Sequence, residues 1–390
     1  MINNRDSSIH IVYIGPQSFP IGAATTKRRR YMIDYMNKHN ISSHYLVTSL
    51  DGGRKMNASE GVYGLCSYCD ISQFASKNNV IGYIRKGKEK LREWFDPKVN
   101  NILVFHTLVN WNEWIFYKYA QKLGYYIVFD QVETSYLQND TGSILFRAQV
   151  RVSEYLSSKA YKECPAFVIS TALYQENREK FPKRKLCLLP NSTPIIKSET
   201  KVSFNTPLLL LYSGTYSPKD GVADLIDGVI MAYKRGVNCK LLLLGKGTSS
   251  DMRVLDKIIG KDYFEYLGYV NDDVLNNTMK DCDILCMTRT NSKFANYGFP
   301  FKLSEYLSTG NILLATNVGD VRQYVEDKKS AFIVDPENPK SIAEAIEYID
   351  QHREEALLIA RNGHKVMEEK FSIDRVGEIF VDFLNSIVHA

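Results

Sequence analysis

Residues 294–310, FANYGFPFKLSEYLSTG, place a cation at the predicted start of a helix. Apolar residues recur there with helical spacing until Gly310, and Pro300 suits a first helical position. Lys302 lies in the first turn, where the helix dipole disfavours a positive charge. Two explanations are open at this point. Lys302 and the free backbone N–H groups bind an anion together, or the lysine is solvated and has no function.

Ionisable residues also follow strands in the first half of the chain. The apolar run 101–106 ends in His106, and the next one, 126–129, leads into Asp130 and Glu133. The carboxyl ends of neighbouring parallel strands meet at one edge of a sheet, where α/β proteins bind ligands. We therefore favour a ligand role for His106 over a purely structural, hydrogen-bonded histidine.

A glycine-bearing loop, PQSFPIGAATT, follows the first predicted strand, residues 9–14. The GxGxxG dinucleotide fingerprint is absent, because only alanines follow Gly22. The basic run 27–30, KRRR, begins the next predicted helix and could meet phosphate or an anionic membrane surface. A solvated helix face is the preferred interpretation of this run.

The composition is that of an ordinary globular protein. The chain has 390 residues, 44% of them hydrophobic and 24% charged, which is enough for two domains. The net charge of +5 is too small to indicate nucleic-acid binding. Seven scattered cysteines predict a reduced, cytoplasmic protein. We attribute the lone CxxC at Cys66 and Cys69 to chance rather than to zinc binding or redox chemistry. The N-terminal residues predict a first strand rather than a signal peptide, and no apolar run is long enough to span a membrane.

Strand and helix patterns alternate twice along the chain. They predict two doubly wound α/β domains with a cleft between them, residues 1–193 and 207–372, joined by a polar linker. Residues 50–80 give little pattern and are expected to be irregular. In the second half we expect helices at 252–259, 339–354 and 356–370, and a polar loop, RTNSK, before residue 294. An amphipathic helix, residues 373–390, ends the chain.

The second half carries an ordered set of motifs within residues 208–350: SGTYSPKDGV, LLLLGKG, YLGYV, CDILCMTR, GFPFKLSEYLSTG and LLATNVGD. In this order they resemble the nucleotide-sugar-binding domain of the retaining family-4 glycosyltransferases, which have the GT-B fold. The first half resembles the family more weakly. The FPxKxxEYL variant is similar to enzymes of capsule, exopolysaccharide and lipopolysaccharide assembly. The resemblance implies that the first domain binds the acceptor and that the helix 373–390 packs back on it.

The resemblance also implies roles for individual residues. Gly214 and Lys219 would meet the donor diphosphate, Lys302 or Arg289 would add positive charge, and Glu305 would bind the ribose hydroxyls. Fixed cations and helix N-termini would then stabilise the departing diphosphate without a metal. The implied donor-binding residues are Gly22, Gly214, Thr215, Lys219, Gly245, Arg289, Tyr297, Gly298, Phe299, Lys302, Leu303 and Glu305. The implied catalytic residues are His106, Lys219 and Lys302, and Asp130 and Glu133 would line the acceptor side.

Two positions depart from the family pattern. Tyr297 stands where the family has its first glutamate, so the donor sugar would have to be held by backbone amides near Gly298 and Phe299. Thr215 stands where an arginine is common. A nucleotide-sugar-binding protein without transfer activity therefore stays open as an alternative, as does another GT-B enzyme such as an epimerase.

The function implied is that of a metal-independent, retaining glycosyltransferase. It would take a sugar from a UDP- or GDP-sugar and pass it to a surface polysaccharide or a lipid-linked glycan. No protein nucleophile is nominated, and the leaving phosphate would assist deprotonation of the acceptor during attack on the same face. We expect no cofactor, no metal and no nucleic acid, and a cytoplasmic protein with peripheral contact to the inner face of the membrane.

Overall fold

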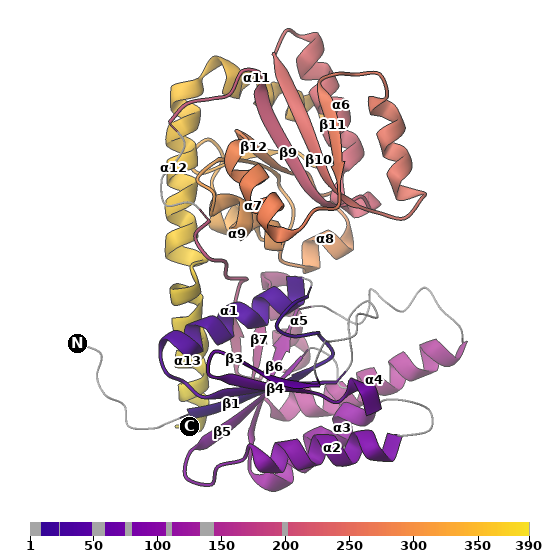
Figure 1. Ribbon diagram of the computed structural model, residues 1–390, viewed down its shortest axis with the longest axis vertical. Helices are drawn as coiled ribbons and strands as arrows, with labels where there is room; N and C mark the ends of the chain where they lie inside the picture. Colours follow the sequence, from indigo (N-terminus) through magenta and orange to yellow (C-terminus); the bar gives the residue numbers. More distant parts are fainter. Residues whose placement is uncertain are drawn as a thin grey trace, which may run out of the picture. The chain divides into compact units, whose positions relative to one another are not determined.

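The computed structural model describes residues 9–22, 24–48, 59–74, 80–106, 111–132, 144–196 and 202–389 (Figure 1). The chain divides into two compact units. Unit 1 comprises Met1–Ser192 together with Ile373–Ala390, and unit 2 comprises Thr193–Ser372. Both are built on a parallel-dominated sheet flanked by helices, which confirms the predicted α/β class.

Unit 1 contains an eight-stranded sheet in the order β3-β4-β2-β1-β5-β6-β7-β8. Its strands are β1 Ile9–Gly15, β2 Ser43–Val47, β3 Glu60–Tyr63, β4 Cys66–Asp70, β5 Asn100–His106, β6 Tyr126–Gln131, β7 Ala166–Val168 and β8 Leu186–Leu188. Only the edge strand β3 is antiparallel to its neighbour. The expectation of an irregular stretch at 50–80 is therefore wrong for β3 and β4. Cys66 and Cys69 are free thiols on β4, and burial raises their pKa values to about 11 and about 12.

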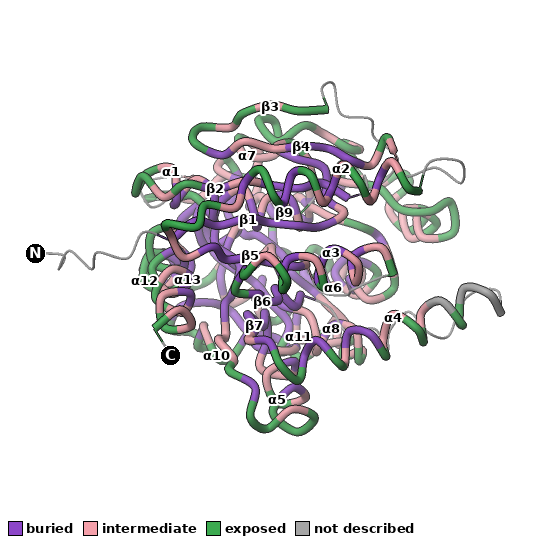
Figure 2. Tube along the Cα trace, turned by 90° about the horizontal axis from the view of Figure 1, so that it is seen from below, coloured by how far each residue is buried: buried purple, intermediate pink, exposed green. Residues whose placement is uncertain are grey.

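Helices cover both faces of this sheet, and Figure 2 shows buried residues concentrated on β1, β5 and β6. The helices of unit 1 are α1 Ala24–Lys38, η2 Ser72–Phe74, α2 Val80–Glu93, α3 Trp111–Leu123, α4 Ile144–Glu163, α5 Thr171–Lys180 and α13 Ile373–Val388. The last of these joins unit 1 through Phe380, whose ring stacks on Phe167 at 4.8 Å and on Tyr13 at 6.2 Å between centroids. None of the described helices is long and apolar enough to cross a bilayer.

Unit 2 contains a six-stranded, fully parallel sheet in the order β11-β10-β9-β12-β13-β14. Its strands are β9 Leu208–Thr215, β10 Cys239–Lys246, β11 Phe264–Gly268, β12 Ile284–Met287, β13 Ile312–Thr316 and β14 Phe332–Val334. Its helices are η4 Pro218–Asp220, α6 Val222–Lys234, η5 Asp251–Ile258, α7 Asp272–Asp281, α8 Lys293–Tyr297, α9 Phe301–Leu307, α10 Val321–Tyr324, α11 Pro339–Gln351 and α12 Arg353–Lys370.

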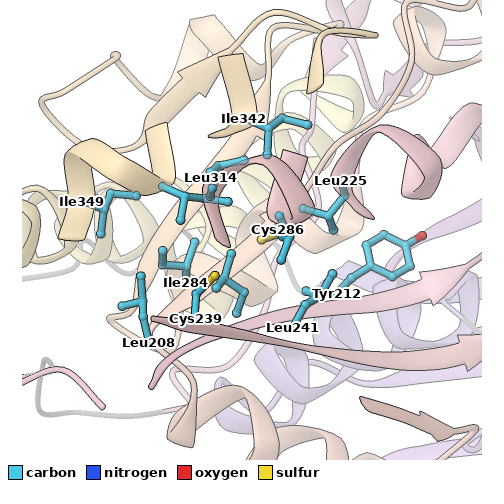
Figure 3. Close-up of a cluster of buried hydrophobic side chains, with 14 of the residues drawn as sticks. Leu208, Tyr212, Leu225, Cys239, Leu241, Ile284, Cys286, Leu314, Ile342 and Ile349 are labelled. Carbon is cyan, nitrogen blue, oxygen red and sulfur yellow. The ribbon is translucent and has the colours of Figure 1, made fainter. Parts of the chain in front are cut away.

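The core of unit 2 lies between the central strands and the helices α6 and α11. Leu208, Leu241 and Ile284 come from three neighbouring strands and are fully buried, as Figure 3 shows. Ile342 of α11 packs close to Gly228 of α6, where a Cβ would lie 2.7 Å from its Cγ2. Parallel strands covered on both faces need continuous apolar sequence, and this explains the near-unbroken runs in the second half.

Three local expectations for unit 2 need correction. The helix predicted at 252–259 is of the 3-10 kind and begins one residue earlier, as η5. At its start Asp251 accepts hydrogen bonds from the N–H and hydroxyl of Thr248, at 3.0 and 2.7 Å. The polar loop RTNSK is shorter than expected, because Ser292 caps α8 by accepting from the N–H of Ala295 at 3.2 Å. The helix break expected at 354–356 lies at His352.

Candidate functional site

The end of β9 meets the first turn of α9 in unit 2. A Cβ placed on Gly214 would overlap the Nζ of Lys302 and would lie 2.7 Å from its Cε. Only glycine therefore lets the lysine come so close to the backbone at the carboxyl end of the strand. The next strand, β10, shows the same close packing, since Gly245 has a φ of 115° and a Cβ there would overlap the Gly214 carbonyl oxygen.

Lys302 is half-buried and lies among charged groups. Its Nζ donates to the Tyr212 hydroxyl at 3.3 Å and lies 4.4 Å from the centre of that ring. Burial lowers the pKa of Lys302 to about 8; Asp220 opposes this shift and Arg289 adds to it. The explanation of Lys302 as a freely solvated lysine is therefore wrong.

Asp220 is the buried carboxylate of this site, and two hydroxyls occupy one of its oxygens. Thr215 Oγ1 donates to Oδ2 at 2.6 Å and Ser217 Oγ at 2.8 Å. The hydroxyl of Thr215 thus holds the loop together. The following residue, Gly221, has a φ of 64°, and a Cβ there would overlap the Thr288 carbonyl oxygen, so the loop requires glycine at this position.

Two further cations face the same edge of the sheet. Arg289, after β12, donates through Nη1 to the Gly298 carbonyl at 3.2 Å, and burial lowers its pKa. Lys219, in η4, places its Nζ 4.0 Å from the centre of the Phe294 ring. Both lower the pKa of Lys302, so the structure brings together the three cations that the sequence singled out.

The remaining predicted donor residues differ in their surroundings. Glu305 is half-buried on α9, one turn from Lys302, and its charge raises the lysine pKa. Tyr297 ends α8, next to Gly298. Phe299 packs its ring against Tyr324 and Phe371, at 5.4 and 5.7 Å between centroids. Its side chain therefore belongs to the core, which leaves only its backbone for a ligand.

Leu303 is not placed for ligand binding. Its side chain is fully buried, and its N–H donates to the Pro300 carbonyl at 3.1 Å. The apolar face of a short amphipathic helix must pack on the sheet, and Leu303 is on that face. Its place in the predicted donor set is corrected to a core position.

Sequence reasoning missed two tyrosines that shape the end of β9. The Tyr306 hydroxyl accepts from the Ser213 N–H at 3.2 Å and donates to the Ser213 carbonyl at 3.3 Å. The Tyr212 hydroxyl donates to the Thr215 carbonyl. Both side chains looked like core in the sequence. The available signal was a tyrosine two residues before Gly214, at the point where an apolar strand ends.

In unit 1, His106 at the end of β5 contacts Arg29 of α1. Nη2 of Arg29 meets Nδ1 of the histidine, and Nη1 donates to the Thr25 carbonyl at 3.1 Å. Burial lowers the pKa of His106 well below its usual value, and Arg29 lowers it further. The imidazole is therefore neutral at physiological pH, and it offers hydrogen bonds rather than charge.

Arg28 of α1 forms a buried ion pair with Asp130 at the end of β6. Its Nη2 lies 2.9 Å from Oδ1, and Nη1 donates to the Pro190 carbonyl at 2.9 Å. Burial alone would raise the pKa of Asp130, but Arg28 holds it below its usual value. The preferred interpretation of residues 27–30 as a solvated face is wrong for Arg28 and Arg29, which are both buried. Glu133 lies outside the described residues.

Gly22 lets the loop after β1 close onto α1. A Cβ there would lie 2.7 Å from Ser18 Oγ and would overlap the Thr26 hydroxyl, which donates to the Ser18 carbonyl at 2.9 Å. The glycine therefore sits inside a small hydrogen-bonded turn at the carboxyl edge of the unit 1 sheet.

Known proteins are similar to unit 2 in sequence and to nearly the whole chain in fold. Residues 207–351 match the family described as glycosyl transferases group 1. An uncharacterized glycosyltransferase of Methanocaldococcus jannaschii is 23% identical over 252 residues, a match that spans 59% of this chain and 61% of the relative. The matched residues 207–351 make up most of unit 2 and include Lys219, Arg289 and Lys302.

Solved structures extend the likeness to nearly the whole chain. Sucrose-phosphate synthase from Thermosynechococcus elongatus gives a TM-score of 0.72 at 12% identity, covering 97% of this chain and 99% of that one. HepE of Anabaena, solved in complex with UDP, gives 0.69 at 14% identity, covering 97% and 100%. At these identities the likeness establishes the fold, which is the predicted GT-B class.

Proposed function

We propose that this chain is a retaining glycosyltransferase that moves a sugar from a nucleoside diphosphate sugar to a surface polysaccharide or lipid-linked glycan. The observation that carries the proposal is the gathering of Lys302, Arg289 and Lys219 at the end of β9, inside a group 1 domain. One buried carboxylate, Asp220, stands among them, and hydroxyls engage it. An anionic ligand is what this arrangement of charge favours.

The cations suit the diphosphate of the donor. Negative charge grows on the leaving oxygen as the sugar departs, and fixed cations in a partly buried site stabilise it strongly. Lys302 is costly to keep charged in the free site, as its lowered pKa shows, and a bound diphosphate would relieve that cost. These side chains take the place of a metal ion in the proposed reaction.

The donor sugar and ribose are assigned to α8 and α9. Glu305 is proposed to accept hydrogen bonds from the ribose hydroxyls, as its half-buried place near Lys302 supports. Tyr297 and the backbone near Gly298 would contact the sugar. The Gly298 carbonyl already accepts from Arg289 and its N–H donates to the Phe294 carbonyl at 3.3 Å, so sugar contact there is assigned to the Phe299 N–H.

Unit 1 is proposed to supply the acceptor side. The neutral imidazole of His106 suits a hydrogen bond to a sugar hydroxyl, and Arg29 fixes its ring. Asp130 would act through Arg28 rather than on the acceptor directly, because Arg28 occupies both of its oxygens. The acceptor oxygen bonds to the anomeric carbon as the bond to the diphosphate breaks, and the leaving phosphate oxygen takes the acceptor proton.

One observation favours a second function. Tyr297 replaces the carboxylate that would hold the donor sugar, and a protein that binds a nucleotide sugar without transferring it needs no such contact. We place the protein in the cytoplasm, at the inner face of the membrane if its acceptor is lipid-linked. Turnover separates the two functions.

Thermal shift against UDP-, GDP- and ADP-sugars identifies the donor, because a ligand that binds only the native state raises the melting temperature. Release of nucleoside diphosphate with lipid-linked acceptors then tests transfer. Lys219→Ala and Glu305→Ala should each lower donor affinity at least tenfold, while Lys340→Ala, an exposed lysine on α11, should not. Wild-type affinity and rate in both site variants would show that the donor site lies elsewhere. Donor binding without any release would leave the binding protein as the function.

A further inference from the structure

Asp220 lies among the cations of the candidate donor site without forming an ion pair with them. The residue is only 7% exposed, and its charge acts to raise the pKa values of Lys302 and Arg289 against the effect of burial. None of the ion pairs between described residues involves its carboxylate. The carboxylate and the cations therefore act on each other across a space rather than in direct contact.

A chain of hydrogen bonds fixes which oxygen of Asp220 is turned to the loop. Lys302 Nζ donates to the Tyr212 hydroxyl at 3.3 Å, and that hydroxyl donates to the Thr215 carbonyl. Thr215 Oγ1 and Ser217 Oγ both donate to Oδ2 of Asp220, at 2.6 and 2.8 Å. Oδ1 receives none of the hydrogen bonds between described residues, and it is not fully buried. Oδ1 is therefore the oxygen that a ligand can reach.

The backbone around Asp220 is also held in place. The Thr288 hydroxyl donates to the carbonyls of Asp220 and Gly221, at 3.4 and 3.2 Å. The Thr290 N–H donates to the Lys219 carbonyl at 3.0 Å. The segment after β12 thus binds three successive carbonyls of this turn. A side chain on a backbone fixed in this way is preorganised, which lowers the entropic cost of binding a ligand.

The ligand group that suits Oδ1 is a hydrogen-bond donor without negative charge. An ionised carboxylate accepts hydrogen bonds and cannot donate them. A diphosphate offers no donor and would be repelled by Asp220, although the three cations attract it. The hydroxyls of a sugar are donors, and in a nucleoside diphosphate sugar the sugar is bonded directly to the diphosphate. A carboxylate beside the cations that bind the diphosphate can therefore reach these hydroxyls.

We propose that Oδ1 of Asp220 accepts a hydrogen bond from a hydroxyl of the donor sugar, which makes Asp220 a specificity-determining residue. It supplies the carboxylate contact that is missing at Tyr297. Glu305 is assigned to the ribose, so the two carboxylates hold different parts of the donor. A buried carboxylate left without its hydroxyl partner is unfavourable, so sugars that lack this hydroxyl bind weakly. The inference rests on the proposed donor site and names the group that recognises the sugar in it.

A purely structural role for Asp220 predicts a different outcome. The hydrogen bonds from Thr215 and Ser217 use only Oδ2, and the oxygen of an amide can accept them as well. Asp220→Asn therefore preserves the loop while it removes the charge and replaces the acceptor Oδ1 with an amino group. If Asp220 serves only the loop, this exchange affects every nucleotide ligand alike. If Oδ1 binds the sugar, it affects the ligand that carries a sugar.

Calorimetric titration with two ligands tests the proposal: the nucleotide sugar that gives the largest thermal shift, and its own nucleoside diphosphate. Asp220→Asn should bind the nucleoside diphosphate as tightly as the wild type or several-fold more tightly, because a repulsive charge is gone. The nucleotide sugar should lose about tenfold or more relative to it, because the hydroxyl loses its acceptor. Asp220→Ser, which removes the carboxylate without adding bulk, should give the same split. Asp224→Asn removes the same charge from the first turn of α6 and should leave both affinities unchanged.

Donor analogues that each lack one sugar hydroxyl identify the contact. One of them should bind the wild type about tenfold or more weakly than the full donor does. In Asp220→Asn the same analogue should lose less than about threefold, because the contact is already absent there. Equal losses in the two proteins would overturn the inference, and so would a wild type to which every analogue binds as tightly as the full donor, whether or not the variants fold.

The two ligands also separate this inference from the proposed donor site. If Asp220→Asn weakens the nucleotide sugar and the nucleoside diphosphate equally, or leaves both affinities unchanged, Asp220 does not bind the sugar and the inference alone is overturned. A wild type that binds neither ligand would overturn the proposed donor site itself.

Discussion

The two units place ionisable side chains at the same kind of position and use them differently. In unit 1, the cation Arg28 at the carboxyl edge of the sheet is buried with Asp130 and with backbone carbonyls. In unit 2, Lys302 has a hydroxyl and an aromatic ring as neighbours, and other cations lower its pKa. Arg28 is paired with a carboxylate in the first site, whereas none of the ion pairs among the described residues involves Lys302 in the second.

The difference separates stability from binding. A buried ion pair with its hydrogen bonds satisfied holds an edge of the sheet together, and removing one partner leaves the other uncompensated. A crowded cation without a matching carboxylate weakens the free protein and favours an incoming anion. The ion pair of unit 1 stabilises that unit, whereas the cations of unit 2 are proposed to bind a ligand.

The largest effect is expected from breaking the balanced site. Asp130→Asn should lower the free energy of unfolding of unit 1 by about 3 to 5 kcal/mol, because Arg28 would stay charged and buried. All three tryptophans, Trp94, Trp111 and Trp114, lie in unit 1, so urea unfolding followed by tryptophan fluorescence reports on this unit. Donor affinity measured on the folded variant should stay close to that of the wild type.

The exposed pair between Lys38 and Asp374 is the control for this change. Its atoms also lie close, at 2.7 Å, but more than half of each side chain is exposed. Lys38→Met should therefore cost less than about 1 kcal/mol. If Asp130→Asn also lowers the free energy of unfolding by less than about 1 kcal/mol, the buried pair of unit 1 does not stabilise the fold more than the exposed pair does.

The opposite pattern is expected at Lys302. Lys302→Met should weaken donor binding about 30- to 100-fold, which corresponds to about 2 to 2.5 kcal/mol. It should also stabilise the ligand-free protein by about 1 to 3 kcal/mol at pH 7, since a cation whose pKa is lowered to about 8 is disfavoured by its surroundings. Calorimetric titration with the donor and thermal unfolding without it measure the two effects. A variant that loses both affinity and stability would make Lys302 a structural residue like Arg28.

Much of the fold could be predicted, because its signals are local. Strands buried on both faces gave continuous apolar runs such as 208–212, and Gly310 marked the end of a helix region. The strands β3 and β4 could not be predicted, because the edge strand β3 and its neighbour β4 are both only partly buried and have no strong pattern. The 3-10 turn η5 depends on a hydrogen bond between Thr248 and Asp251, which the helical spacing of its residues concealed.

The site was predictable where chemistry and spacing agree. Lys302 was conspicuous because a cation at a helix start is unfavourable. Arg28 and Arg29 were not, since a run of four basic residues is most often solvated, and only the fold brings Asp130 and His106 against them. Tyr212 was invisible for a related reason. Its ring packs in the core while its hydroxyl lies at the site, and the sequence shows only that the residue suits a core position.

Unit 1 also holds a half-buried histidine, His44, that should make it sensitive to acid. The His44 ring stacks on Trp94 with 4.7 Å between centroids, and burial lowers its pKa to about 3. The unfolded chain takes up a proton below pH 6.5 and the folded one does not, so stability falls as the pH falls. Between pH 7 and pH 5 the contribution of His44 to this loss should be about 2 kcal/mol. Tryptophan-monitored urea unfolding at both pH values measures it.

His44→Gln removes the titrating ring and should remove the His44 contribution to this loss, although it lowers the stability at pH 7. Burial also lowers the pKa values of His10, whose ring lies 4.8 Å from that of His44, and of His106, so both contribute in the same direction. If the variant keeps the full dependence, the acid sensitivity of unit 1 originates elsewhere.

The smallest effect is expected from the titration of Lys302 in unit 2. Burial sets the pKa of Lys302 to about 8, with Asp220 and Glu305 raising it and Arg289 and Lys219 lowering it. A bound diphosphate favours the charged lysine, so the donor should bind about tenfold more weakly at pH 9 than at pH 7. Lys302→Arg keeps its charge over this range and should bind the donor with little pH dependence. Titration of the nucleotide itself is common to both proteins, so calorimetry on the pair isolates the lysine. Equal slopes would mean that another group titrates and that the lysine charge is not what holds the donor.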